Sequence, residues 1–446
     1  MSRVALIGRN SLEYISLLIE IWNSGNCAVL IDCQTPYNAA AEMMREAGVK
    51  KCYLQTSLWD ANVVNEFCDI EFICFDVDNT AIFVIPDCLY NKFVPNYSKA
   101  EAVIIYSSGT TGKSKGIVLS HFAINTNADA VIKYITSSAD NECIYTIRHL
   151  SHSSTLTCEL LVALKSHMKM IVAASTPVPR LVFSAISKYH VTILCVNPTI
   201  LSLLCDELVR RSYTISSIRK IYVSGAVLSD ATYEKAKFAF AGVSIFNAYG
   251  LSEAGPRVAV QGPENCNCNS AGKPICGVKV VIVNERGMTV TDGERGVVHV
   301  KTPSLFSGYV MGKEKYVSLY QGWLNTGDIG FWDKLGELHV VGRVDDVIIC
   351  DAHKIYPTDV EKMILEDPSI SDCVVSQCTV NGIEMIGCLY ISDKDCAIGI
   401  VRRIKDRLAQ YEIPKRYLKT EAIPHNNRGK VDRKAVSEIL SIGMKK

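Results

Sequence analysis

The sequence predicts an α/β fold in which a large N-terminal domain of helix-flanked sheets carries a barrel-like β subdomain and precedes a small α+β C-terminal domain. Three observations support this prediction. Helical patterns alternate with short apolar runs up to residue 223, short Val-rich runs punctuated by glycine begin near residue 275, and a polar break at 342–346 precedes a tail with its own strand and helix signals. We place the domains at 1–344 and 345–446.

The first helix is expected to begin at a capping box, Asn10-x-x-Glu13, and to end by Gly25. Between these points apolar residues recur on one helical face. Further helices are expected near 38–47 and 155–165. The runs expected to form strands are 27–31, 52–54, 71–75, 103–106, 170–173, 191–196 and 221–223. Such alternation is typical of a parallel sheet covered by helices.

The second half of the chain has a different pattern. The runs 278–283 and 296–301 are short, rich in valine and bounded by glycine, which indicates an antiparallel or barrel-like subdomain. In the tail, Pro357 precedes Thr358-x-x-Glu361, a second capping box that predicts a helix start.

Composition excludes several classes of protein. The 446 residues are 48% hydrophobic and 21% charged, as in globular proteins of more than one domain. Lys plus Arg minus Asp plus Glu is 47 − 46 = +1, which disfavours nucleic acid as a partner. No apolar run approaches the ~20 residues of a membrane span, and residues 4–7 are too short for a secretory signal. We therefore expect a soluble, cytoplasmic protein without a membrane partner.

The 18 cysteines contain no Cys-x-x-Cys pair, so we expect mostly reduced core thiols and no disulfide framework. Cys266, Cys268 and Cys276 lack a fourth metal ligand at the usual spacing, which disfavours a metal site there.

The most informative segment is 103–116, an apolar run that leads into a loop of small and hydroxyl residues with two lysines. Backbone amides, hydroxyls and ammonium groups in such a loop can converge on phosphate oxygens, which predicts a nucleotide phosphate site. A solvated turn is the alternative. A third interpretation, the P-loop of NTPases, requires glycine where Ser107 stands and a helix where 116–120 is expected to form a strand.

Four other segments carry polar groups suited to a nucleotide. Tyr249, Ser252 and Glu253 offer a stacking face, a hydroxyl for phosphate and a carboxylate for Mg²⁺. Asp328, after Thr-Gly, is able to accept hydrogen bonds from ribose, and Lys430 follows glycine in a turn. The segment 342–346 is the fourth. Taken singly, these residues are equally well explained as a core aromatic, a surface charge, an Asx turn and an exposed lysine.

In this order and spacing, the five segments resemble the adenylate-forming (AMP-binding) superfamily of acyl-CoA and aryl-CoA synthetases, stand-alone adenylation enzymes and luciferases. The resemblance covers about Val4 to Val436, and the phosphate loop, Gly342-Arg343-x-Asp345 and Gly429-Lys430 are its most specific parts. It implies attack of a carboxylate on the α-phosphorus of ATP with release of pyrophosphate, then transfer of the acyl group to a thiol. The implied cofactors are ATP and Mg²⁺, and the implied acceptor is CoA or the phosphopantetheine of a carrier protein.

The resemblance also implies roles for individual residues. The β- and γ-phosphates are assigned to Ser107, Ser108, Gly109, Thr110, Thr111, Gly112 and Lys115. Adenine and ribose are assigned to Gly225, Ala226, Asn247, Tyr249, Asp328 and Arg343. The catalytic set is Ser252, Glu253, Arg343 and Lys430, with Glu253 also the Mg²⁺ ligand. Candidates for the acyl pocket are His152, Ser154, Ala248, Ala254 and Gly255. Asp345 corresponds to the hinge about which a mobile C-terminal domain carries Lys430.

The chain departs from the family pattern in three places. Ser114 replaces a usual proline, and Ile349 and Ala352 replace a usual lysine and glycine beside the thiol tunnel. The phosphate loop also begins early, near residue 106, as though the family's opening segment were shortened, which leads us to expect a homodimer.

Amino-acid-activating members of the superfamily use an aspartate to pair the substrate ammonium, and no aspartate occurs between Asp140 and Asp206. We therefore expect a short or aromatic acid and not an α-amino acid. Arg257 is either a partner for a second polar group of the substrate or a surface residue. The alternatives are an enzyme that loads only a carrier protein, and a non-catalytic nucleotide-binding relic.

Overall fold

The computed structural model describes residues 1–59, 69–78, 80–108, 114–135, 142–175, 178–211, 213–262, 270–290, 293–310, 319–350, 353–425 and 431–442. The chain divides into two compact units. Unit 1 comprises Met1–Gly225, Ala236–Val280 and His299–Asn325, and unit 2 comprises Ala226–Lys235, Val281–Val298 and Thr326–Lys446. The predicted division between residues 344 and 345 remains a prediction.

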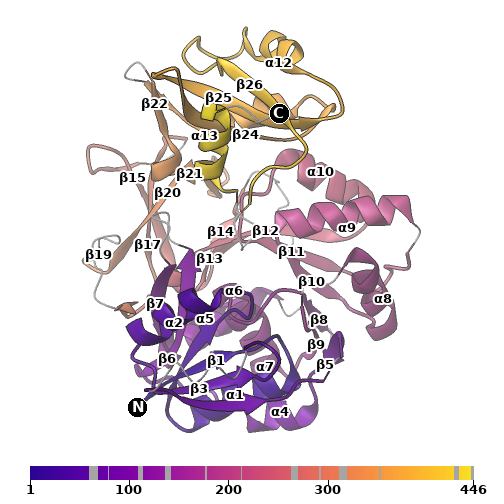
Figure 1. The fold of residues 1–446 in the computed structure, drawn as a ribbon, viewed down its shortest axis with the longest axis vertical. Helices are drawn as coiled ribbons and strands as arrows, with labels where there is room; N and C mark the ends of the chain where they lie inside the picture. Colours follow the sequence, from indigo (N-terminus) through magenta and orange to yellow (C-terminus); the bar gives the residue numbers. More distant parts are fainter. Residues whose placement is uncertain are drawn as a thin grey trace. The chain divides into compact units, whose positions relative to one another are not determined.

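The first sheet of unit 1 has seven strands in the order β18-β7-β6-β2-β1-β3-β4. Four of them, β1, β3, β6 and β7, are labelled in Figure 1. Their bounds are β1 Arg3–Ile7, β2 Cys27–Ile31, β3 Lys51–Gln55, β4 Glu71–Phe75, β6 Glu101–Ser108, β7 Ser114–Ser120 and β18 Gly308–Tyr309. The strands from β6 to β4 pair in parallel, while β7 pairs antiparallel with both β6 and β18. The predicted parallel sheet is therefore confirmed.

The second sheet has eight strands in the order β14-β13-β12-β11-β10-β8-β9-β5. Their bounds are β5 Ile82–Val84, β8 Cys143–Thr146, β9 Lys169–Ala173, β10 Ile193–Val196, β11 Lys220–Ser224, β12 Ser244–Gly250, β13 Arg257–Val260 and β14 Lys273–Pro274. The strands β9, β8, β10, β11 and β12 pair in parallel. The carboxyl ends of these strands therefore meet at one edge, where α/β proteins place their ligands.

Strands β1 and β2 of the first sheet are almost wholly buried, so both faces of that sheet must be covered by helices. One face packs against α2, through Ala40, Met43 and Met44, and α1 lies against β1 and β2. The helices of this part of the chain are α1 Leu12–Asn23, α2 Tyr37–Glu46, α4 Asp87–Lys92, α5 His121–Ile135, α6 Ser153–Thr155, the π-helix η1 Leu156–Leu161, α7 Val162–Ser166, α8 Pro179–Tyr189, α9 Pro198–Arg210, α10 Asp230–Ala239 and the 3-10 turn η2 Ser252–Ala254.

The third sheet has the order β16-β15-β17-β20-β19, and β21 pairs with β20. The bounds are β15 Lys279–Val283, β16 Thr289–Val290, β17 Gly296–Lys301, β19 Leu319–Tyr320, β20 Trp323–Trp332 and β21 Leu338–Arg343. The pairs β15–β16, β19–β20 and β20–β21 are antiparallel, as predicted for the Val-rich region.

The last part of unit 2 has an α+β core. A three-stranded sheet, β24-β25-β26, carries α11 and α12 on one face and α13 on the other. The bounds are η5 Val344–Asp346, β22 Ile348–Cys350, β23 His353–Ile355, α11 Pro357–Leu365, β24 Ile370–Val380, β25 Ile383–Ser392, α12 Ala397–Ile404, β26 Arg416–Thr420 and α13 Arg433–Ile442. The predicted α/β class is confirmed.

Both predicted capping boxes are wrong in detail. The N-cap of α1 is Ser11, whose side chain accepts a hydrogen bond from the Tyr14 amide, while the Asn10 side chain bonds distant backbone. In α11 the Thr358 hydroxyl donates to the Val341 carbonyl, and Glu361 accepts from the Val375 amide. In each case tertiary hydrogen bonds outcompete the local cap.

Within the described ranges, no helix is both long and apolar enough to span a membrane. The cysteines of the same ranges are free, and most are buried, as expected for reduced core thiols.

Candidate active site

The predicted phosphate loop connects the two strands of an antiparallel hairpin. Ser107 is opposite Lys115 and Ser108 is opposite Ser114 in the pairing of β6 with β7. Because a strand and not a helix follows the loop, the P-loop of NTPases is excluded. Lys115 is half-buried on β7. The remaining predicted phosphate ligands, Gly109, Thr110, Thr111 and Gly112, lie outside the described residues.

Glu253 lies in η2, directly after β12, and is half-buried. Its Oε1 accepts a hydrogen bond of 2.8 Å from the hydroxyl of Tyr309. Its carbonyl accepts from the amide of Phe306 at 2.9 Å. The carboxylate is thereby held in one orientation. A single carboxylate supplemented by substrate phosphates is a usual Mg²⁺ site, so Glu253 fits the metal role.

Tyr309 connects this carboxylate to the hairpin. It lies on β18, opposite Ile117 of β7, and the Lys115 ammonium is 5.9 Å from the centre of its ring. One tyrosine therefore contacts both the predicted metal ligand and the predicted phosphate-binding lysine. Tyr309 could not be predicted from the sequence, because a lone tyrosine after glycine in a two-residue strand carries no local signal.

Ser252 also has a partner in unit 1. Its hydroxyl lies 2.7 Å from that of Ser153 in α6, which fastens the loop after β12 to the helical segment that contains the acyl-pocket candidates His152 and Ser154. The side chains of His152 and Ser154 are half-buried. The sequence analysis did not select Ser153, because nothing distinguishes it from its neighbouring serines.

Three further acyl-pocket candidates flank the same loop, and all are buried: Ala248, Ala254 and Gly255. Gly255 has a φ of +95°, and a Cβ there would lie 2.5 Å from Ser304. Only glycine fits this turn without moving the backbone.

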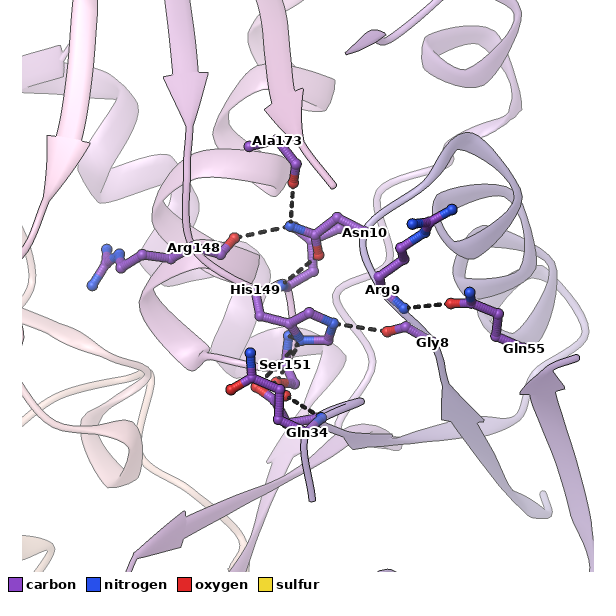
Figure 2. A network of polar contacts seen from close by, with 11 residues as sticks. Gly8, Arg9, Asn10, Gln34, Gln55, Arg148, His149, Ser151 and Ala173 are labelled. Atoms are coloured by element: carbon purple, nitrogen blue, oxygen red, sulfur yellow. Dashed lines mark hydrogen bonds and ion pairs between the residues drawn. The ribbon is translucent and has the colours of Figure 1, made fainter. Parts of the chain in front are cut away.

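The loop after β8 is anchored by hydrogen bonds to other strand ends (Figure 2). The Asn10 side-chain amide donates to the carbonyls of Arg148 and Ala173, both at 3.0 Å. The His149 imidazole contacts the Gly8 carbonyl through Nε2 and the Ser151 hydroxyl through Nδ1, both at 2.8 Å. The network holds residues 148–151 against the ends of β1 and β9.

The carbonyl of Arg148 belongs to this network, while its side chain extends into the core. Its guanidinium is 2.8 Å from Oε1 of Glu159, and the Thr146 hydroxyl donates to Oε2 of Glu159 at 2.9 Å. Burial raises the pKa of Glu159 above its ordinary value, although Arg148 opposes the shift. Arg148 also reaches the Ser224 hydroxyl at 3.5 Å, beside Gly225 of the predicted adenine site.

Two other predicted adenine residues lie on β12. The Asn247 amide donates to the Gln261 side chain at 2.8 Å, and its side-chain amide donates to the Ser270 carbonyl at 3.0 Å. Tyr249 is half-buried on the same strand, opposite Ala259. Gly225 belongs to unit 1, whereas Ala226, which is exposed, belongs to unit 2.

In unit 2, Asp328 and Arg343 are opposite each other on β20 and β21. The Arg343 guanidinium donates to Oδ1 of Asp328 at 2.9 Å, and the Asp328 amide donates to the Thr326 hydroxyl at 3.0 Å. Asp328 is buried and Arg343 is partly exposed. The preceding Gly327 has a φ of +70°, which suits glycine at this turn. The structure therefore brings together two of the residues predicted to bind ribose.

The predicted hinge residue, Asp345, is exposed in η5. The next residue, Asp346, faces Arg433 of α13 at 3.5 Å, and Arg433 also pairs with Glu361 at 2.9 Å. Lys430, the predicted catalytic lysine, and Ala352 lie outside the described residues. So do Cys266 and Cys268 of the disfavoured metal site. In the described part of the chain, no group of three or more metal-ligating side chains converges.

The sequence matches known proteins over nearly its whole length. A family model described as "AMP-binding enzyme" matches residues 1–310. A 2-succinylbenzoate–CoA ligase of Bacillus mycoides (strain KBAB4) is 26% identical over 454 residues, a match that spans 98% of this chain and 88% of that protein. The protein of the same name from Bacillus subtilis (strain 168) is 27% identical over 346 residues, or 76% of this chain and 69% of its own.

Solved structures share the fold. ATP-bound MatB from Rhodopseudomonas palustris superposes with a TM-score of 0.88 at 20% identity, over 100% of this chain and 90% of that one. The O-succinylbenzoate coenzyme A synthetase MenE from Bacillus subtilis, in complex with AMP, superposes with a TM-score of 0.81 at 23% identity, over 97% of this chain and 87% of that one.

Proposed function

The chain belongs to the AMP-binding enzyme family, and we propose that it is an AMP-forming ligase that activates a carboxylic acid with ATP and transfers the acyl group to a thiol. The first step forms an acyl-adenylate and pyrophosphate. The second releases AMP and leaves a thioester. Relatives that match 98% of this chain are named as CoA ligases, which supports CoA as the acceptor.

One observation carries most of this proposal. Tyr309 contacts both Glu253, at the end of a strand of the second sheet, and Lys115, on the hairpin of the first. The residues proposed to bind phosphate and Mg²⁺, which come from two sheets, thus share one contacting tyrosine in unit 1. Carboxylate attack on a polyanion requires such convergence, because its barrier is lowered mainly by alignment and by neutralised charge.

Each side chain of the site has a task in the first step. Lys115 and the loop of 107–112 bind the β- and γ-phosphates, and Glu253 would hold Mg²⁺, which would supply positive charge against them. Ser252 reaches the α-phosphate, while Asp328 and Arg343 bind ribose. Lys430 bridges the acid carboxylate and the α-phosphate in the transition state, so its loss slows adenylation far more than it weakens ATP binding.

The second step rests on the tail of the chain. In this proposal the domain 345–446 turns about Asp345, which withdraws Lys430 and admits the thiol. The exposed position of Asp345 suits a hinge. A carrier-protein acceptor stays a prediction, and loading assays would distinguish it from CoA. A homodimer also stays a prediction, and light scattering would distinguish it from a monomer.

The test is acid-dependent exchange of labelled pyrophosphate into ATP over a panel of short and aromatic acids. We expect exchange with some acids, its loss by two orders of magnitude or more in Lys430→Ala, and a comparable loss in Glu253→Gln. Absence of exchange with every acid would favour the nucleotide-binding relic, and full activity of Lys430→Ala would overturn the mechanism.

A further inference from the structure

Arg257 is a charged residue in the core of unit 1. It opens β13, four residues after Glu253, and only 6% of its surface is exposed, so the surface alternative raised from the sequence is wrong. Asn127 of α5 fixes its backbone on both sides: Oδ1 accepts from the Arg257 amide at 3.0 Å, and Nδ2 donates to its carbonyl at 2.9 Å. The guanidinium is therefore carried by a rigid segment.

The Arg257 side chain has unused hydrogen-bonding capacity. Its buried Nη1 has no hydrogen-bond partner. The titratable groups that act most strongly on its charge are Tyr134, Cys158, which also hydrogen-bonds the guanidinium, and Cys195, and none of them is an acid strong enough to balance it. A buried guanidinium left in this condition is costly, and buried unpaired donors in native proteins usually serve a ligand or an ordered water.

The surrounding charges do not balance. Glu159 is a carboxylate that interacts electrostatically with Arg257, and Arg148 already holds it at 2.8 Å. Two guanidiniums and one carboxylate sum to +1. Protonation of Glu159 at acid pH would increase this excess further.

Further donors and acceptors around Glu159 also lack partners. Buried atoms without hydrogen bonds include Arg148 Nε, Tyr134 Oη and the hydroxyls of Thr155 and Thr157. Both threonines are wholly buried, one just before η1 and one in its first turn. A π-helix is rare and is found preferentially at functional sites.

The position of the cluster relates it to the acyl-adenylate. The hydrogen bond between Ser153 and Ser252 joins the start of the helical segment that leads to Glu159 to the start of the loop that leads to Arg257. Ser252 is the residue assigned to the α-phosphate. An acid bound with its reacting carboxylate near Ser252 would extend between these two segments, toward Arg257.

We propose that Arg257 binds a second carboxylate of the substrate, and that the enzyme activates a dicarboxylic acid. This inference rests on the proposed function, since it names the acid used at the same site. An incoming carboxylate cancels the excess charge and supplies Nη1 with the acceptor it lacks, in a charge-assisted hydrogen bond. Arg257 is in this account a specificity residue, because the reacting carboxylate lies at the other end of the acid.

The first test compares acids on the unaltered enzyme. Pyrophosphate exchange is measured with succinate and butyrate, glutarate and valerate, and phthalate and benzoate. We expect the better diacids to exceed their matched monoacids in kcat/KM by roughly 10- to 100-fold, the effect of a buried hydrogen bond to a charge. Equal or better use of the monoacids would overturn the inference and leave the proposed function standing. Exchange with no acid would overturn both.

A second test changes the side chain. Arg257→Met should remove the advantage of diacids over monoacids, and Arg257→Lys should keep part of it. Arg219→Met is the control, because Arg219 is half-exposed and pairs with Glu142 instead. Loss of exchange in equal proportion for diacids and monoacids in a folded Arg257→Met would contradict the inference. Should that variant fail to fold, the comparison of acids on the unaltered enzyme decides.

Discussion

A buried arginine in unit 1, Arg257, and a half-buried arginine in unit 2, Arg433, have opposite surroundings. In unit 1, Glu159 pairs with Arg148 at 2.8 Å, and the nearby Arg257 has no hydrogen-bond partner for Nη1. In unit 2, one arginine, Arg433, faces two carboxylates: it donates to Glu361 at 2.9 Å and to the Val375 carbonyl at 2.7 Å, and it lies 3.5 Å from Asp346. The first cluster has an excess of positive charge, and the second has an excess of negative charge with its donors in use.

The difference between the two arginines indicates different roles, one in the stability of the fold and one in binding. Arg433 pairs with two half-buried carboxylates, so its charge is part of the folded state of unit 2. It ties the start of α13 to the residue that follows the predicted hinge. The charge of Arg257 is left for something that the folded chain does not supply. The same substitution at the two positions should therefore have opposite consequences.

The largest expected effect is on stability. Arg433→Met should lower the free energy of unfolding of the full chain by about 1–3 kcal/mol, because it leaves the largely buried carboxylate of Glu361 without its partner. Arg257→Met should change it by less than about 1 kcal/mol or raise it, because an apolar chain of similar length replaces an unpaired charge. Urea denaturation checks both values, with the exposed Arg402→Met as a control. Equal losses of unfolding free energy in Arg433→Met and Arg257→Met would contradict the proposed difference between the two arginines.

The second expected effect is that the stability lost in Arg433→Met depends on pH. Burial raises the pKa of Glu361 above 4.5 and of Asp346 above 3.8, and Arg433 opposes both shifts. A carboxyl whose pKa is raised by folding binds more protons in the folded state, so its share of stability is present at acid pH and is lost as pH rises past the ordinary pKa. Without Arg433, the two carboxyl groups lose more stability as the pH rises, because nothing then opposes the effect of burial.

The gap in unfolding free energy between the unaltered chain and Arg433→Met should therefore be smallest near pH 4 and widen toward pH 7. Denaturation curves at four or five pH values in this range measure it. A gap that stays constant or narrows would show that the arginine acts through packing and not through charge.

A smaller effect is expected at Tyr309, which contacts the site without bearing a charge. Tyr309→Phe should lower acid-dependent pyrophosphate exchange by about tenfold through loss of the hydrogen bond to Glu253, and should raise the Mg²⁺ concentration needed for half-maximal rate. Tyr145→Phe is the matched control, since the Tyr145 hydroxyl is buried without a partner. An unchanged Mg²⁺ dependence in Tyr309→Phe would argue against Glu253 as the Mg²⁺ ligand.

The smallest effect is expected at Ser153. Ser153→Ala removes the hydrogen bond to Ser252 and should lower exchange three- to tenfold, the kinetic equivalent of about 0.5–1.5 kcal/mol. The exposed Ser216→Ala serves as the control. An unchanged rate would mean that the two segments bracketing the acid do not need this bond.

Much of the fold could be predicted because periodicity and turn residues report it directly. The strand after the phosphate loop, which excluded an NTPase P-loop, was visible as 116–120 and belongs to β7. Helix starts were less secure. Asn10 and Thr358 have the right spacing for caps, but both side chains form tertiary hydrogen bonds that no local pattern encodes.

The site shows the same limit. Ser252, Glu253, Asp328 and Arg343 were predicted by resemblance, and the structure shows contacts for each. Tyr309 was missed because its role depends on a strand pairing between residues far apart in the chain. The choice between surface and substrate for Arg257 required burial and charge balance, which only the folded core reveals.

The most direct test of the central claim is the identity of the nucleotide product. With ATP, Mg²⁺, a carboxylic acid and CoA, the enzyme should release AMP and pyrophosphate in amounts equal to the thioester formed. Release of ADP and inorganic phosphate, or nucleotide turnover that does not depend on the acid, would contradict the account.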